Sequence, residues 1–224
     1  RLAVRVPIGV QGCYDIGLDV ESWMRNGLVD IAIGQTFSGP ELVDCNADYR
    51  ELVATAKGTG VHVMATLQSL IDSDRLGQGT VEVIRACACN YWEQEVDGLY
   101  LGHWFGNWPY DASFYEKLRE LPYPEVMAAK DKYYYTPTGT GRYPHPAIEP
   151  GARCPLPLEI AEGETVTAPL VISDDLERWG THGRIHELIL RLRLESVTET
   201  DELRFRLNGA DLPESGLRRI NELY

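Results

Sequence analysis

The chain has 224 residues, enough for one large domain or two ordinary ones. Its 44% hydrophobic and 25% charged residues are typical of a globular protein with a packed core. The formal net charge of −13 argues against nucleic-acid and anionic-membrane binding, and no run approaches the roughly 20 apolar residues of a spanning helix.

The first 120 residues alternate short apolar strands with helices. Asp19 is a good helix N-cap and Gly27 a good helix stop. Asp48 and Glu51, three residues apart, predict a capping box for a helix that ends at Gly58. Strands are expected over 2–7, 28–35, 61–67 and 98–102, and helices over 19–27, 48–58, 80–95 and from 113 onward.

This alternation predicts a parallel sheet in an α/β fold. The unit length of about 30 residues is that of a (β/α)8 barrel, which needs about 250 residues for its eight units. Four units therefore predict the C-terminal half of such a (TIM) barrel over residues 1–136, with the N-terminal half of the same protein missing. An open doubly wound sheet is the alternative, but no G-x-G-x-x-G fingerprint follows the first strand.

The composition changes after Tyr135. Residues 137–155 are rich in proline and glycine and are expected to form a linker. Beyond them the hydrophobic period becomes two, with alternate leucines from Leu188 to Leu194 and a strong turn signal at Asn208-Gly209. Residues 156–224 are therefore expected to form a small antiparallel β-sandwich that is truncated at its C-terminus.

The sequence predicts neither a metal site nor a cofactor. The five cysteines lack the pair spacing of a zinc site, and Cys87 and Cys89 are two apart in a predicted helix, so they point in different directions. Buried free thiols are expected. A phosphate-bearing cofactor would need a glycine cradle or clustered cations, and neither is present.

Ligands of parallel α/β sheets meet the loops after the carboxyl ends of the strands. The residues placed there, Arg5, Gln35, His103, Trp104 and Asn107, form the predicted substrate-binding set. Sugars present hydroxyl groups and C–H faces, which amides, a guanidinium, an imidazole and a tryptophan suit. A hydrogen-bonded structural role for His103 and a core position for Trp104 are also compatible with the sequence. Further residues near strand ends are Tyr14, Asp15, Thr36, Gln68, Ser69 and Trp108.

Glycoside hydrolysis normally needs two carboxylates about 5–9 Å apart. Asp15 and Asp111 are the acidic residues nearest to strand ends, and they do not make a convincing pair. The catalytic residues are therefore unassigned, and the catalytic acids of a hydrolase would lie largely upstream.

The segments "GLDVESWMRNGLVDIAIG", "VDGLYLGHWFG" and "YEKLRELPYPEVMAAKDKYY" resemble the bacterial family-10-like glycosyl-hydrolase proteins, as does the tail "LRLRL…LRFRLNG". The resemblance implies a (β/α)8 barrel joined to a C-terminal β-sandwich and a role in carbohydrate metabolism. It implies a glycoside hydrolase acting on an oligo- or polysaccharide, although no catalytic residue carries over. One alternative is a non-catalytic carbohydrate-binding or scaffold protein on the barrel fold, and another is an intact small α/β enzyme.

Overall fold

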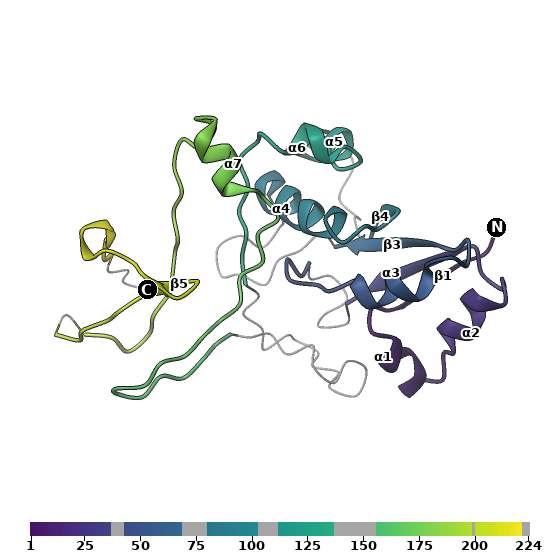
Figure 1. Ribbon diagram of the computed structural model, residues 1–224, viewed down its shortest axis with the longest axis horizontal. Helices are drawn as coiled ribbons and strands as arrows, with labels where there is room; N and C mark the ends of the chain where they lie inside the picture. The colour runs from purple at the N-terminus through teal and green to yellow at the C-terminus, as the bar shows by residue number, and fades with distance from the viewer. Residues whose placement is uncertain (37–42, 69–79, 103–111, 137–155, 199, 221–224) are drawn as a thin grey trace. The chain divides into compact units, whose positions relative to one another are not determined.

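The computed structural model describes residues 1–36, 43–68, 80–102, 112–136, 156–198 and 200–220 (Figure 1). The chain divides into two compact units, Arg1–Arg184 and Ile185–Tyr224. The first contains a four-stranded parallel sheet with helices, and the second a two-stranded antiparallel sheet. The expected α/β class is therefore confirmed.

The parallel sheet has the strand order β1-β2-β3-β4, so each strand lies beside its neighbour in sequence. All three pairings are parallel, as predicted. The four expected strands are present with slightly shorter bounds: β1 Ala3–Pro7, β2 Ile31–Gln35, β3 His62–Leu67 and β4 Gly98–Leu101.

The helices of the first unit mostly follow the expected positions. Asp19 caps the second helix by accepting a hydrogen bond from the Ser22 N–H (3.1 Å), and Gly27 ends it with φ +63°. The first helix was not predicted, because its sequence, VQGCYD, has a glycine at its third position and reads as a loop. The bounds are α1 Val10–Asp15, α2 Val20–Arg25, α3 Arg50–Ala56, α4 Val81–Trp92, α5 Ala112–Glu120, α6 Pro124–Met127 and α7 Leu176–Thr181.

The predicted capping box at α3 is wrong. Tyr49 is the N-cap residue and provides no side-chain capping hydrogen bond; its hydroxyl group donates to the Thr66 carbonyl instead (3.3 Å). Asp48 instead pairs with Arg50 (2.6 Å), and Glu51 accepts a hydrogen bond from the Val10 N–H (3.2 Å). Asp48 also accepts a hydrogen bond from the Arg50 N–H (3.1 Å) at the start of α3, whereas Glu51 contacts α1 in place of the N-terminus of its own helix.

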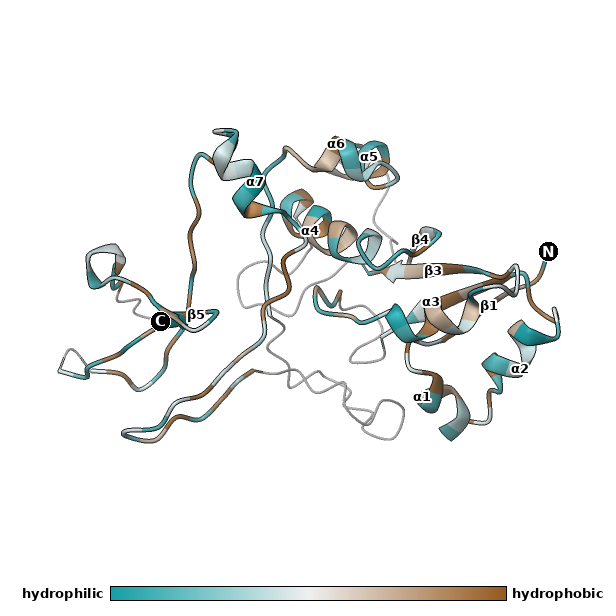
Figure 2. Cartoon of the chain, in the orientation of Figure 1, coloured by the Kyte–Doolittle hydropathy of each residue, from teal (hydrophilic) through white to brown (hydrophobic). Residues whose placement is uncertain are grey.

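The core lies between one face of the sheet and helices α1 to α4. Val6, Ala32 and Val63 form one buried cluster with side chains of α1, α2 and α3. Ala65 and Leu67 form a second cluster with the buried side of α4. Figure 2 shows the apolar colour of β3, which contributes to both clusters. The helices in the described ranges up to residue 102 therefore cover the same sheet face.

Gly34 permits the close approach of α3 to β2. A Cβ atom at this position would lie 2.9 Å from Tyr49 Cε1 and 3.0 Å from Leu52 Cδ2. The Tyr49 ring also packs edge-to-face on Tyr91 of α4, with the ring centroids 5.0 Å apart. Any side chain at position 34 would therefore displace a packed aromatic ring.

A segment after the predicted linker packs against α4. The buried Asn90 donates from Nδ2 to the carbonyl groups of Cys45 (2.8 Å) and Val171 (3.0 Å). Its Oδ1 accepts a hydrogen bond from the Ser173 N–H (3.0 Å). The nearly buried Lys132 forms an ion pair with Asp174 (3.1 Å). The first compact unit therefore extends over residues that the sequence assigns to the sandwich; the linker itself, 137–155, lies outside the described residues.

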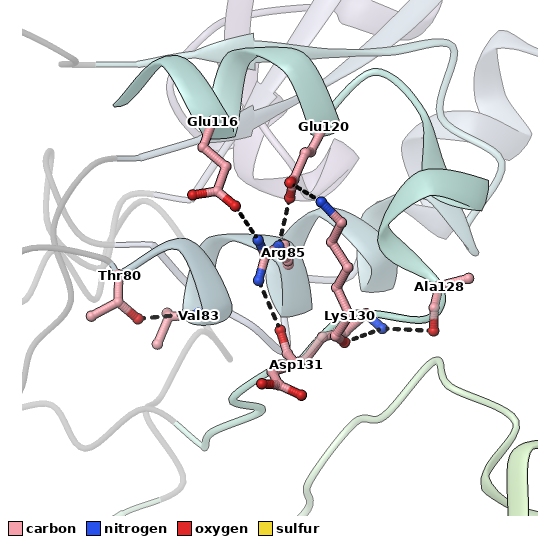
Figure 3. Close-up of polar contacts among 9 residues, drawn as sticks. Thr80, Val83, Arg85, Glu116, Glu120, Ala128, Lys130 and Asp131 are labelled. Carbon is pink, nitrogen blue, oxygen red and sulfur yellow. Dashed lines mark hydrogen bonds and ion pairs between the residues drawn. The ribbon is translucent and has the colours of Figure 1, made fainter. Parts of the chain in front are cut away.

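A buried ion-pair network joins α4 to α5 (Figure 3). The Arg85 guanidinium points from α4 toward α5 and bonds Glu120 (Nε to Oε2, 2.6 Å) and Glu116 (3.0 Å). It also donates to the Asp131 carbonyl oxygen (3.3 Å), and Lys130 pairs with the other oxygen of Glu120. The side chains of Arg85 and Glu120 are 7% and 5% exposed, so their charges depend on each other for solvation.

The charge state of Glu120 follows from this network. Burial by itself raises the pKa of the Glu120 carboxyl group. The hydrogen bonds and charges of Arg85 and Lys130 outweigh burial, so that the pKa lies below its ordinary value. Glu120 is therefore ionised at neutral pH.

The second unit contains the predicted turn. Strands β5 (Arg206–Leu207) and β6 (Ala210–Asp211) pair in antiparallel fashion around Asn208 and Gly209, whose φ angles are +50° and +83°. These are the two left-handed residues that a type I′ hairpin requires. A short 3-10 helix, η1, follows at Glu214–Gly216.

The strand predicted around residues 188–194 is not formed in the described part of this unit, where β5 and β6 are the strands present. Leu188, Leu190, Leu192 and Leu194 are 64%, 44%, 55% and 40% exposed. A sheet forms when an apolar row packs on a second surface, and the described residues of this unit do not provide one.

The cysteines agree with the prediction where they are described. Cys13, Cys45, Cys87 and Cys89 are buried free thiols, and Cys154 lies outside the described residues. Burial raises the pKa of the Cys89 thiol to about 11 and also raises that of Cys87, so both remain protonated. None of the helices within the described ranges is long and apolar enough to cross a membrane.

Candidate functional site

The sheet has a second face, away from helices α1 to α4. Arg5 lies beside Ile33, Ile33 beside Met64 and Met64 beside Gly98 in the strand register. A Cβ atom at Gly98 would lie 3.3 Å from Met64 Cε, so this row shares one face. We call it the open face; its strand residues are Ala3, Arg5, Pro7, Ile31, Ile33, Gln35, His62, Met64, Thr66, Gly98 and Tyr100.

Polar side chains gather where the open face reaches the carboxyl ends of the strands. Gln35, Thr66 and Gln68 are 1%, 3% and 1% exposed. A Cβ atom at Gly102 would lie 2.6 Å from Gln68 Oε1 and 2.9 Å from Thr66 Cγ2. Gly34 of β2 pairs with Ala65 of β3, so the next residues along these two strands, Gln35 and Thr66, are also neighbours. We call Gln35, Thr66, Gln68 and Gly102 the carboxyl edge.

Two buried polar atoms of the carboxyl edge lack a hydrogen-bond partner among the described residues. They are Gln35 Oε1 and Thr66 Oγ1. A buried polar group without a partner costs about 1–3 kcal/mol, and native proteins contain few of them. Such groups are what a hydroxyl-bearing ligand would satisfy.

Arg5 supplies the charge of the open face. Its side chain is exposed, and it forms no hydrogen bond or ion pair with the described residues. At the strand positions of this face it is the one side chain with a permanent charge. The imidazole of His62 lies near Asp97 (3.5 Å) at the amino end of the sheet.

The sequence placed two of its five predicted site residues on this face. Arg5 and Gln35 lie on adjacent strands of the open face, two residues apart in register. His103, Trp104 and Asn107 lie outside the described residues. The sequence prediction missed Thr66, which could have been found by counting back two residues from Gln68 along the same strand.

No acidic residue occupies a strand position of the open face, and Asp97 approaches this face only at the amino end, beside His62. Asp15 belongs to the exposed part of α1, where it accepts a hydrogen bond from Gln11 (2.8 Å). Asp44 has its pKa raised by burial, partly offset by a hydrogen bond from the Asn46 N–H. The Asp44 carbonyl group accepts from Tyr91 of α4 (2.6 Å), which places this residue on the helix side of the sheet.

A cavity in the described ranges is apolar and lies elsewhere. It measures about 310 Å³ and is bounded by β4, α4 and α5. Trp92, Leu99, Leu101, Leu118 and Leu121 supply most of its wall. It contains none of the polar residues of the carboxyl edge, and it lacks the convergent polar groups that orient a ligand.

The described residues contain no group of three or more histidine, cysteine or acidic side chains that could hold a metal ion. The arrangement can therefore bind hydroxyl groups through amide and hydroxyl side chains, beside one guanidinium. Comparison with known proteins found no family model that matches the chain and no curated protein that matches it.

Proposed function

We propose that this chain is part of a glycoside-hydrolase-like (β/α)8 barrel and that its carboxyl edge binds an oligo- or polysaccharide. The observation that carries the proposal is that two buried atoms, Gln35 Oε1 and Thr66 Oγ1, have no hydrogen-bond partner among the described residues. Sugar hydroxyl groups can both donate to and accept from such atoms, so they complete the hydrogen bonding of this site.

The arrangement of the sheet supports the barrel. In a closed barrel the strands follow each other in sequence order, the helices lie outside, and the other face turns inward. β1 to β4 have this order, and α1 to α4 cover one face. Strands from the N-terminal half of the same protein complete the barrel in this proposal.

A non-catalytic carbohydrate-binding protein on the same fold is the second candidate. It is favoured by the composition of the open face, whose strand positions include amides, a hydroxyl and a guanidinium but no carboxylate. Hydrolysis would need two carboxylates from other parts of the protein. Measurement of released reducing ends alongside binding separates the two candidates.

Titration calorimetry with a panel of tetrasaccharides tests the proposal. Trp104→Ala should weaken binding by about 1–3 kcal/mol if Trp104 stacks on the sugar, a magnitude typical of an aromatic anchor. Trp179→Ala is the matched control, because Trp179 lies on α7 beside Arg178 and Arg184 and is not a residue of the carboxyl edge. Unchanged affinity of Trp104→Ala would dismiss the stacking role, and absence of binding to the whole panel would dismiss the carbohydrate site.

A further inference from the structure

We infer that the bound saccharide carries a carboxylate, as a uronic acid does, and that Arg5 binds this group. The inference deepens the proposed function and rests on it. Its basis is the contrast between one fixed guanidinium on the open face and the absence of any carboxylate at the strand positions of that face.

The state of Arg5 is the first step. The described residues provide Arg5 with no acidic partner, while seven other arginine and lysine side chains among them form ion pairs. A guanidinium has five donors in a planar fork that matches a carboxylate with two parallel hydrogen bonds. Because Arg5 belongs to a paired strand, the sheet fixes the backbone position from which this fork extends.

The position of Arg5 is the second step. Arg5 pairs in register with Ile33, and Gln35 is two residues further along β2. Two residues of strand correspond to about 7 Å, and adjacent strands lie about 4.8 Å apart. These spacings are within the span of one sugar ring with its carboxylate, so one residue of the saccharide can reach both Gln35 and Arg5.

The surrounding charge is the third step, because the chain as a whole is acidic, with a net charge of −13. Asp30 and Asp97 are located directly before β2 and β4, at the amino ends of the strands. Ile33, at the level of Arg5, is three residues or about 10 Å beyond Asp30. Screening has a length of about 8 Å at physiological ionic strength, so the guanidinium dominates the local field.

The experiment compares acidic sugars with their neutral counterparts. Calorimetry measures binding of galacturonate, glucuronate and mannuronate tetrasaccharides, each beside its carboxyl-reduced form, to the full chain. At least one acid should bind about tenfold or more tightly than its reduced form, as a charged bidentate hydrogen bond implies. Arg5→Gln should abolish this preference, because it weakens binding of the acid more than binding of the reduced form. Arg5→Lys should keep part of the preference, and Arg25→Gln, on the exposed side of α2, should keep all of it.

The outcomes separate the inference from the proposed function. Equal binding of every acid and its reduced form overturns the inference while the carbohydrate site stands. Absence of binding to all acidic and neutral sugars overturns both. If Arg5→Gln lowers the unfolding midpoint and the preference persists, Arg5 pairs with a carboxylate of the protein, and the inference is wrong. A sulfated, carboxyl-free galactose tetrasaccharide serves as a further probe, and its tighter binding than every uronate would contradict the carboxylate assignment. Rising salt should weaken binding of the acid by the wild-type chain more than that of the reduced form, and this comparison needs no variant.

Discussion

Replacement of Gln35 by methionine separates a ligand-binding role from a structural one. Gln35 is 1% exposed, and its Oε1 has no hydrogen-bond partner among the described residues. Methionine has nearly the same length and removes the polar atoms. A buried unpartnered polar group costs about 1–3 kcal/mol, and a small packing mismatch returns part of that gain. Gln35→Met should therefore raise the free energy of unfolding by about 1 kcal/mol.

The same change should weaken saccharide binding by about tenfold, since one hydrogen bond to the ligand is lost. Urea unfolding followed by circular dichroism measures the first effect, and calorimetry measures the second. Gln94→Met is the matched control, because the Gln94 amide is fully bonded. It donates to the carbonyl groups of Ala47 (3.0 Å) and Asn90 (2.9 Å), and its Oε1 accepts from the Tyr49 N–H (2.6 Å). Gln94→Met should lower the free energy of unfolding by about 2–3 kcal/mol.

The two variants should thus change stability in opposite directions. If Gln35→Met destabilises the chain as Gln94→Met does and saccharide affinity stays constant, Gln35 is a structural residue. That result would refute the argument from the unpartnered atom and remove the main support for the carboxyl edge as a binding site.

Glu120→Gln should lower the free energy of unfolding by about 3–5 kcal/mol at pH 7, because it leaves the buried guanidinium of Arg85 without its closest carboxylate. Glu116 is half-exposed, so Glu116→Gln should lower the free energy of unfolding by less than about 1 kcal/mol. Because the pKa of Glu120 is lowered by folding, its ionised form stabilises the folded state above the unfolded pKa of about 4.3, and this stabilisation is lost as the pH falls through the folded pKa. In urea titrations below pH 4, the free energy of unfolding of the wild type should therefore approach that of Glu120→Gln. Gly34→Ala should lower the unfolding midpoint, at a cost of about 1–3 kcal/mol for overpacking, whereas Gly9→Ala, whose nearest contact would be 3.9 Å away, should be nearly neutral in the same assay. Asn90→Ala should cost about 2–4 kcal/mol and expose the chain around residue 171 to limited proteolysis; an unchanged cleavage pattern would show that other contacts hold this segment.

The sequence predicts the parallel sheet well because its signals are local. Each strand is a short apolar run, and helix α2 has a strong N-cap at Asp19 and a glycine stop at Gly27. The capping box of α3 failed for a tertiary reason, since Glu51 contacts the backbone of Val10, 41 residues away. A contact at this separation leaves no trace in the spacing of residues along the chain.

The C-terminal region shows the opposite limit. The Asn208-Gly209 turn was predictable because both residues favour the left-handed backbone that they adopt. The alternate leucines from Leu188 onward have the two-residue hydrophobic period of a strand and predict one equally well. This period, however, shows only which side chains would share a face. Strand formation also needs a partner to supply hydrogen bonds and apolar contact, and this depends on residues distant in sequence.

The candidate site was predictable in part because strand direction fixes where ligands meet a parallel sheet. That rule selected Gln35 and Gln68 as neighbours of the carboxyl ends, but it could not say which polar atoms would remain without partners. The answer depends on the alternation of faces: Gly34 turns toward the helices and admits Tyr49, so Gln35 must turn toward the open face. The glycine that lets α3 approach the sheet and the amide of the proposed binding site are therefore consecutive residues of one strand. A change of register by one residue would bury the amide beneath the helix and remove the proposed site.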